Sequence, residues 1–253
     1  MMVLVFIYAY IAVLGLIMGS FYNVVGLRVP NGESIVRPPS HCPNCNRRLG
    51  IRELIPVLSY IFQRGKCRSC YTKISPIYPF FEALTAALFV FTFHYIGFDF
   101  EVLVAWALCS LLVIITISDL HYQIIPDKVL LFFGGLMIAL RFWLPTEPWY
   151  DAFFGAAMGF GLLLLIAVVS RGGMGGGDIK LFAVLGLALG ISNTLLTLFL
   201  AAVLGTIVGL MLVPFHKVKR GVPFAFGPFI AVGALISYFY GETILDWYVT
   251  TFF

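Results

Sequence analysis

Long apolar runs alternate with short polar segments along most of the chain. A run of about 20 apolar residues is long enough to cross the hydrocarbon core of a bilayer as a helix. Eight runs fit this reading, although the sixth is short and follows a glycine-rich stretch. We expect helices over residues 3–20, 79–97, 102–119, 128–145, 152–170, 179–191, 194–214 and 223–241. The pattern predicts an all-α polytopic membrane protein with eight transmembrane helices.

Composition agrees with this class of protein. Hydrophobic residues make up 61% of the 253 residues and charged residues 11%, whereas soluble domains average about 45–50% apolar and about 25% charged residues. The first run has no lysine or arginine before it and no small-residue cleavage pattern after it, so we expect a retained helix rather than a signal peptide. The lipid bilayer is the first partner that the sequence implies.

One polar segment, residues 21–78, is longer than the others and strongly basic. It holds only two acids, Glu33 and Glu53, beside nine basic residues: Arg28, Arg37, Arg47, Arg48, Arg52, Arg64, Lys66, Arg68 and Lys73. The positive-inside rule places such a segment in the cytoplasm. By alternation of the helices, the loops at 120–127, 171–178 and 215–222 share that side. Because topology accounts for the basic residues, we expect no nucleic-acid partner.

Four cysteines in this segment form two pairs, C-P-N-C (Cys42 and Cys45) and C-R-S-C (Cys67 and Cys70). Two such turns aim four thiolates at one point, which suits tetrahedral zinc. Two disulfides are the alternative, but thiols stay reduced in the cytoplasm. No open coordination position is indicated, so the expected zinc is structural and stabilises a segment with few core residues. Cys109, in the middle of a helix, is expected to be a packing residue.

Two aspartates lie at the expected cytoplasmic ends of membrane helices. Asp119 ends the third helix and Asp178 begins the sixth, so the topology places both at the same membrane face. Ionisable residues that border membrane helices are costly to bury and are therefore functional candidates. Two carboxylates held close together share a proton, so that one can activate a water molecule while the other polarises a carbonyl, as in aspartic proteases.

Each acid in this region also has a simpler interpretation. Asp119 fits a solvated helix end, and Asp178 fits a helix cap. Asp127 follows Pro126 and is expected to cap the fourth helix. His121 is a second acid–base candidate, but its position is more typical of an interfacial histidine.

The glycine-rich stretch R-G-G-M-G-G-G-D-I-K, residues 171–180, is not a phosphate-binding loop. Such a loop needs lysine and serine or threonine directly after its last glycine, whereas Asp178 follows Gly177. An acid at this position would repel phosphate.

Several motifs resemble those of the type IV prepilin peptidases. G-S-F-Y-N-V-V-G-L-R-V-P, residues 19–30, is similar to the segment that follows the first helix of that family. The two C-x-x-C pairs resemble the family's zinc domain. I-S-P-I-Y-P-F-F-E, residues 74–82, is similar to its I-S-x-R-Y-P-x-x-E segment, with Ile77 in place of the usual arginine.

Two further motifs resemble the catalytic motifs of the same family. One is D-x-x-x-x-x-x-P-D, from Asp119 to Asp127, and the other is G-x-G-D, from Gly175 to Asp178. Each motif alone is weak, but five in the same order are specific, and together they cover nearly the whole chain.

The resemblance implies that Asp119 and Asp178 are the catalytic pair of a membrane aspartic protease. It implies cleavage of a short basic leader from prepilin and pseudopilin precursors, just after a glycine, in the bacterial cytoplasmic membrane. It also implies a second reaction, methylation of the new N-terminal amine with S-adenosylmethionine. No fingerprint for that methyl donor is readable in the sequence.

The expected organisation has three parts. A first transmembrane helix (1–20) precedes a small cytoplasmic zinc-ribbon-like domain held by the four cysteines (21–78), and a membrane aspartic protease domain (79–253) follows. The sequence leaves open whether the chain forms a homo-oligomer and which pilin it processes.

A zinc-regulated ion or proton transporter is the main alternative, with Asp119 and Asp178 lining the pathway. Transport predicts carboxylates near the middle of the bilayer, whereas these two lie at helix ends. A scaffold for a secretion system, with zinc organising a docking surface, is a further alternative.

Overall fold

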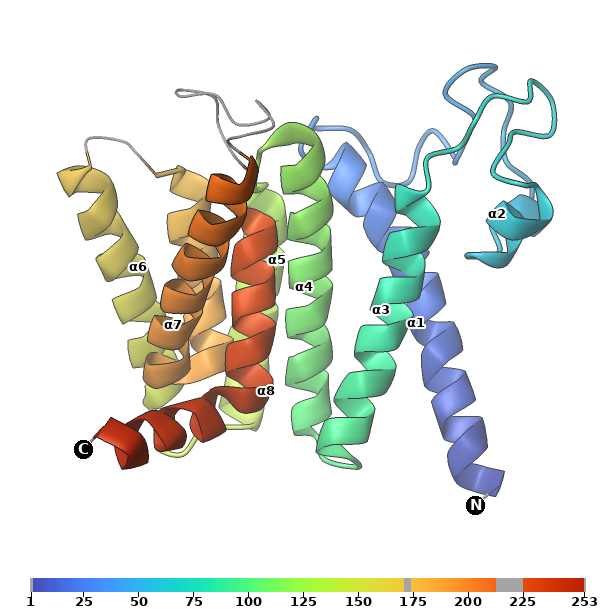
Figure 1. Cartoon of the computed structure of the whole chain (residues 1–253). Coiled ribbons are helices and arrows are strands. Elements are labelled where there is room, and N and C mark those ends of the chain that lie inside the picture. Colours follow the sequence, from blue (N-terminus) through green and yellow to red (C-terminus); the bar gives the residue numbers. More distant parts are fainter. Residues whose placement is uncertain (1, 171–173, 213–224, 253) are drawn as a thin grey trace. The chain divides into compact units, whose positions relative to one another are not determined.

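The computed structural model describes residues 2–170, 174–212 and 225–252, and every regular element within these residues is helical (Figure 1). The chain divides into two compact units, Met1–Val102 and Leu103–Phe253. The elements are α1 (Met2–Arg28), the 3-10 helix η1 (Ile51–Glu53), α2 (Leu58–Phe62), α3 (Ile77–Ile96), α4 (Glu101–Tyr122), α5 (Asp127–Trp143), α6 (Asp151–Val169), α7 (Gly176–Leu212) and α8 (Gly227–Phe252).

Six of the described helices are long and apolar enough to cross a membrane: α1, α3, α4, α6, α7 and α8. Helix α5, with 17 residues, coincides with the fourth expected segment, and α7 covers the sixth and the described part of the seventh. The prediction of an all-α polytopic membrane protein is therefore confirmed. The expected loop at 215–222 and residues 171–173 of the glycine-rich stretch lie outside the described residues.

In the first unit, α1 and α3 pack closely along their length (Figure 1). A Cβ atom at Gly15 would lie 2.6 Å from the Cα of Ala86, and one at Gly19 would lie 2.8 Å from the Cα of Glu82. Small residues allow membrane helices to approach in this way. Helix α1 continues past residue 20, where the expected span ended, as far as Arg28, because residues in this last part are buried.

In the second unit, α7 is interrupted at Gly190, whose φ of 72° is not helical. Figure 1 shows that the chain reverses direction within α7, so that both ends of the element lie at the same level. The carboxylate of Asp151 accepts a 3.2 Å hydrogen bond from the N–H of Ile191, a donor that the interruption leaves without a helical partner. The break separates the two runs that the sequence indicated.

Arg141 of α5 stabilises the other side of this break. Its side chain is buried, and it donates hydrogen bonds to the carbonyl oxygens of Leu187, at 3.1 Å, and Ala188, at 2.8 Å. These carbonyls end the first part of α7 and have no helical N–H to accept from beyond Gly190. The structure therefore gives Arg141 a local function at this break.

Helices α6 and α7 approach one another closely at Gly155 and Gly186. A Cβ atom built on Gly186 would overlap the backbone of Gly155 and the N atom of Ala156. Backbone atoms in a packed helix cannot rotate away as a flexible side chain can. The spacing of these two helices therefore depends on glycine at this contact.

Replacing Gly186 by alanine is expected to lower the free energy of unfolding by about 1–3 kcal/mol, the usual cost of overpacking. Gly135→Ala is the matched control, because a Cβ there meets no described atom within 4 Å; it should be neutral or stabilising by up to about 1 kcal/mol. Unfolding in detergent, followed by circular dichroism, measures both variants. Equal stability of the two would contradict the close α6–α7 contact.

Candidate functional site

Asp119 lies near the C-terminal end of α4 and is only 6% exposed. Its Oδ2 atom accepts a 2.7 Å hydrogen bond from the backbone N–H of Gly227, the first residue of α8. A Cβ atom at residue 227 would lie 2.8 Å from that oxygen, so glycine is needed for this approach. The positive end of α8 therefore holds the Asp119 carboxylate. The alternative of a solvated helix end for Asp119 was wrong.

Sequence reasoning missed Gly227 as part of this site. The last helix was expected to begin at residue 223, whereas α8 begins at Gly227; residues 223 and 224 lie outside the described part of the chain. The available signal was the pair Gly227-Pro228, because proline in the first turn is typical of a helix start. Nothing in the sequence indicated that this helix start would meet Asp119.

Asp178 is the third residue of α7, and its backbone N–H donates to the carbonyl oxygen of Gly175 at 3.1 Å. It therefore lies inside the first turn rather than at a cap position. The glycine before it is in tight contact, since a Cβ at Gly177 would lie 2.7 Å from the Cβ of Ile125. The glycine lets the start of α7 pack against the turn that follows α4.

The structure brings the carboxylates of Asp119 and Asp178 close enough for their charges to interact. Asp119 lies near the end of α4 and Asp178 lies at the start of α7. Gly177, beside Asp178, packs on Ile125 in the turn that follows α4, and this contact brings the two helix ends together. Two neighbouring carboxylates can share a proton, which is the arrangement needed to activate water against a carbonyl. That the pair is catalytic remains a prediction.

Other candidate residues nearby have structural partners. Asp127 is the first residue of α5 and Pro126 occupies the N-cap position, so the expected cap was wrong. The Asp127 carboxylate instead accepts hydrogen bonds of 2.8 and 2.7 Å from Nζ of Lys180, in an exposed ion pair. The Nδ1 atom of His121 lies 2.9 Å from the carbonyl oxygen of Ile117, one turn earlier in its own helix. This contact agrees with an interfacial histidine.

The four cysteines of the C-x-x-C pairs come together in the first unit. Their Sγ atoms all lie within 4.8 Å of one another, with 3.7 Å between Cys42 and Cys70 and 4.0 Å between Cys45 and Cys67. A tetrahedral zinc with Zn–S bonds of about 2.3 Å separates its sulfur ligands by about 3.8 Å. The cluster has the spacing of a four-sulfur metal site. None of these four cysteines forms a disulfide, and Cys109 is buried in α4.

The two cysteine turns have matching backbone conformations. The N–H of Asn46 donates to the carbonyl oxygen of Cys42 at 2.9 Å, and the N–H of Tyr71 donates to that of Cys67 at 3.0 Å. Asn46 and Tyr71, each directly after the second cysteine of its pair, have φ values of 54° and 57°. Because two similar turns face one another, all four sulfur atoms meet at one point.

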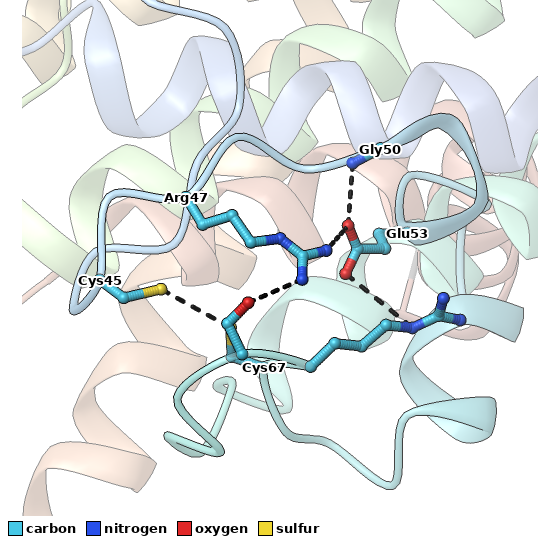
Figure 2. Close-up of polar contacts among 7 residues, drawn as sticks. Cys45, Arg47, Gly50, Glu53 and Cys67 are labelled. Carbon is cyan, nitrogen blue, oxygen red and sulfur yellow. Dashed lines mark hydrogen bonds and ion pairs between the residues drawn. The ribbon is translucent and has the colours of Figure 1, made fainter.

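Arg47 connects the two turns to a buried acid, as Figure 2 shows. Its guanidinium donates to Oγ of Ser69 at 2.7 Å and to Oε2 of Glu53 at 2.5 Å. The same Glu53 oxygen accepts from the N–H of Gly50 at 2.9 Å, and Arg68 lies 3.9 Å from the other oxygen. The Gly50 N–H, with the two arginines, holds the pKa of the Glu53 carboxyl below its usual range. The sequence did not indicate this function of Glu53.

Comparison with known proteins gives matches to both units. The family described as the bacterial peptidase A24 N-terminal domain matches residues 13–96, and the type IV leader peptidase family matches residues 106–210. Three curated relatives are prepilin leader peptidase/N-methyltransferases. The protein of Bacillus subtilis (strain 168) is 41% identical over 94% of this chain and 96% of its own length. Those of Neisseria gonorrhoeae and Aeromonas hydrophila are each 32% identical over 94% of this chain and 93% and 92% of their own lengths.

The chain therefore belongs to the type IV leader peptidase family, a class of multi-pass membrane peptidases. No solved structure gives a significant match to it.

Removing the Glu53 carboxylate should loosen the cysteine turns. In Glu53→Ala, Arg47 and the Gly50 N–H lose their buried acceptor, and we expect a loss of about 1–2 kcal/mol of local stability. Limited proteolysis of the segment between α1 and α3 measures this as faster cleavage. Glu33→Ala, which truncates an exposed acid of the same segment, is the matched control. Equal cleavage rates in the two variants would show that the Glu53 interactions do not stabilise the turns.

Proposed function

We propose that this chain removes the short basic leader from type IV prepilins and pseudopilins, and then methylates the new N-terminal amine with S-adenosylmethionine. The names of the relatives and the family of the chain support both activities. The observation that carries the peptidase proposal is that Asp119 and Asp178, two carboxylates from separate helices, lie within electrostatic reach of one another at helix ends. The chain is a membrane aspartic endopeptidase.

The two carboxylates have different roles in hydrolysis, one as general base and the other as general acid. One accepts a proton from a water molecule, whose oxygen then adds to the carbonyl carbon of the glycine before the scissile bond. The other donates a proton to the carbonyl oxygen, and the leaving amine takes up a proton as the C–N bond breaks. Gly227 contributes by holding the Asp119 carboxylate in place through its N–H.

The location of the site fits this substrate. A prepilin has a basic leader in the cytoplasm and an apolar helix in the bilayer, so its scissile bond lies at the cytoplasmic face. The excess of basic residues in the segment 21–78 supports a cytoplasmic location for that segment in the bacterial inner membrane. By the alternation of helices, Asp119 and Asp178 then lie at the same face.

The four cysteines hold a structural zinc ion in a cytoplasmic domain over residues 21–78, between the first transmembrane helix (1–20) and the protease domain (79–253). The donor set and the sulfur spacing suit zinc. Four sulfur ligands complete the coordination of the ion, so its function is to hold the two turns together. Arg47, which reaches Ser69 and Glu53, reinforces the same link.

A transporter is not favoured by these findings. The relatives are named for peptidase and methyltransferase activity, and Asp119 and Asp178 lie at helix ends.

Exchanging either aspartate for asparagine should abolish leader removal. Asp119→Asn and Asp178→Asn each remove one acid–base group, so we expect at least about a thousandfold loss of rate. The purified protein and a prepilin in detergent, followed by gel shift or mass spectrometry, give the measurement. Asp246→Asn, at an exposed position of α8, is the matched control. Both variants should still methylate a short peptide that already has the processed N-terminus. Normal cleavage by both would exclude the pair as catalytic residues.

Metal analysis tests the zinc assignment. The purified chain should contain one zinc ion per molecule, and Cys70→Ser should lose most of it because one of four ligands is gone. Cys109→Ser, a change of a buried cysteine away from the cluster, should keep the metal. Detection of two disulfides among Cys42, Cys45, Cys67 and Cys70 instead would contradict both the zinc site and the cytoplasmic location.

A further inference from the structure

A cavity of about 450 Å³ lies in the first unit, away from Asp119 and Asp178 in sequence. Its walls come from the end of α1, the start of α3 and the cysteine turns, and they include Asn23, Glu82, Cys42 and Cys67. This volume is within the range of about 300–1,000 Å³ that is typical of small-molecule sites. The peptidase proposal uses none of these residues at the reacting bond.

Asn23 offers the cavity a hydrogen-bond acceptor in a fixed orientation. The residue is 4% exposed, and its Nδ2 donates 3.2 Å hydrogen bonds to the carbonyl oxygens of Gly19 and Tyr78. Because both partners are carbonyl oxygens, the amide nitrogen of Asn23 must face them. This fixes the positions of the nitrogen and the oxygen in the side-chain amide. That oxygen, Oδ1, has no hydrogen-bond partner among the described residues. A buried acceptor left unpaired costs about 1–3 kcal/mol, so it is suited to a donor group of a ligand.

Glu82 offers the cavity a negative charge. Its Oε2 accepts a 2.7 Å hydrogen bond from the N–H of Val57, which ties the carboxylate to the segment between the cysteine turns. No described basic side chain forms an ion pair with Glu82. Glu53, the other acid of the cavity wall, differs because Arg47 and Arg68 lie beside its carboxylate. Ser20 also gives Glu82 a side-chain hydrogen bond, and a bound cation would add a partner of opposite charge.

The cavity wall also holds Arg28 and Lys73. The ligand that fits is therefore small and carries a positive group for Glu82 and an acidic group for these bases, with N–H or O–H donors. S-adenosylmethionine has these properties, since it combines a sulfonium cation and an acidic group with amino and hydroxyl groups. We propose that this cavity binds the methyl donor, with Glu82 supplying the negative charge for the sulfonium and Asn23 Oδ1 accepting a hydrogen bond from the ligand. This assignment rests on the methyltransferase activity proposed above and gives that activity a location.

The charge change in the reaction makes the assignment testable. In the transfer, the lone pair of the neutral N-terminal amine forms a bond to the methyl carbon. The C–S bond breaks with its electron pair on sulfur, and the amine gives up one proton to water. The product S-adenosylhomocysteine is a neutral thioether at sulfur, so Glu82 should favour the donor over the product.

Equilibrium binding of S-adenosylmethionine and S-adenosylhomocysteine to the full-length protein in detergent, by calorimetry, provides the test. Glu82→Gln should weaken binding of the donor by about tenfold or more, the effect of removing one charged partner, and change binding of the product by less than about threefold. Asn23→Leu removes the shared acceptor and should weaken binding of both. Glu33→Gln, outside the cavity wall, should bind both as the unmodified chain does.

Two further measurements show whether the variants are folded. Each should retain one zinc ion per chain and cleave prepilin at the normal rate, because the changes lie outside the peptidase site; a variant that loses zinc is replaced by Glu82→Asp or Asn23→Ser. Donor binding that is unchanged in folded Glu82 and Asn23 variants of an active methyltransferase overturns the cavity assignment. So does loss of methylation with normal donor binding, since the cavity would then hold the amine substrate. An unmodified chain that neither binds the donor nor methylates would instead refute the proposed methyltransferase activity.

Discussion

Polar groups in the membrane part of this chain must find their partners within the protein, because lipid offers none. The break in α7 shows how strongly this constraint acts. Two carbonyl oxygens end the first part of the helix, and Arg141 binds both; one N–H begins the second part, and Asp151 binds it. Arg141 and Asp151 are therefore placed where the backbone needs them.

The same constraint shapes the aspartate site. Asp119 is buried, and the backbone N–H at the start of α8 donates a hydrogen bond to its carboxylate. Glycine at residue 227 makes this possible, just as Gly177 allows the start of α7 to approach Ile125. Gly177, directly before Asp178, thus serves close packing, which brings the second carboxylate within electrostatic reach of the first.

Outside the membrane part, the constraint is different. The segment between α1 and α3 has few core residues, and its described helices, η1 and α2, are short. Four cysteines and the Arg47–Glu53 pair hold its turns together. The cavity is a consequence of this arrangement, because the turns cover a space between the ends of α1 and α3 that the two helices do not fill themselves.

The sequence by itself determined the all-helical membrane class and the cysteine spacing, because apolar run length and tight-turn ligand pairs are local properties. It also singled out Asp119 and Asp178, since an acid at the end of an apolar run can be recognised from the order of residues alone. Tertiary structure alone decided the Gly227 contact and the pairing of Asp127 with Lys180. It alone revealed the unpaired oxygen of Asn23. These features join residues far apart in the chain, and only packing between helices sets such distances.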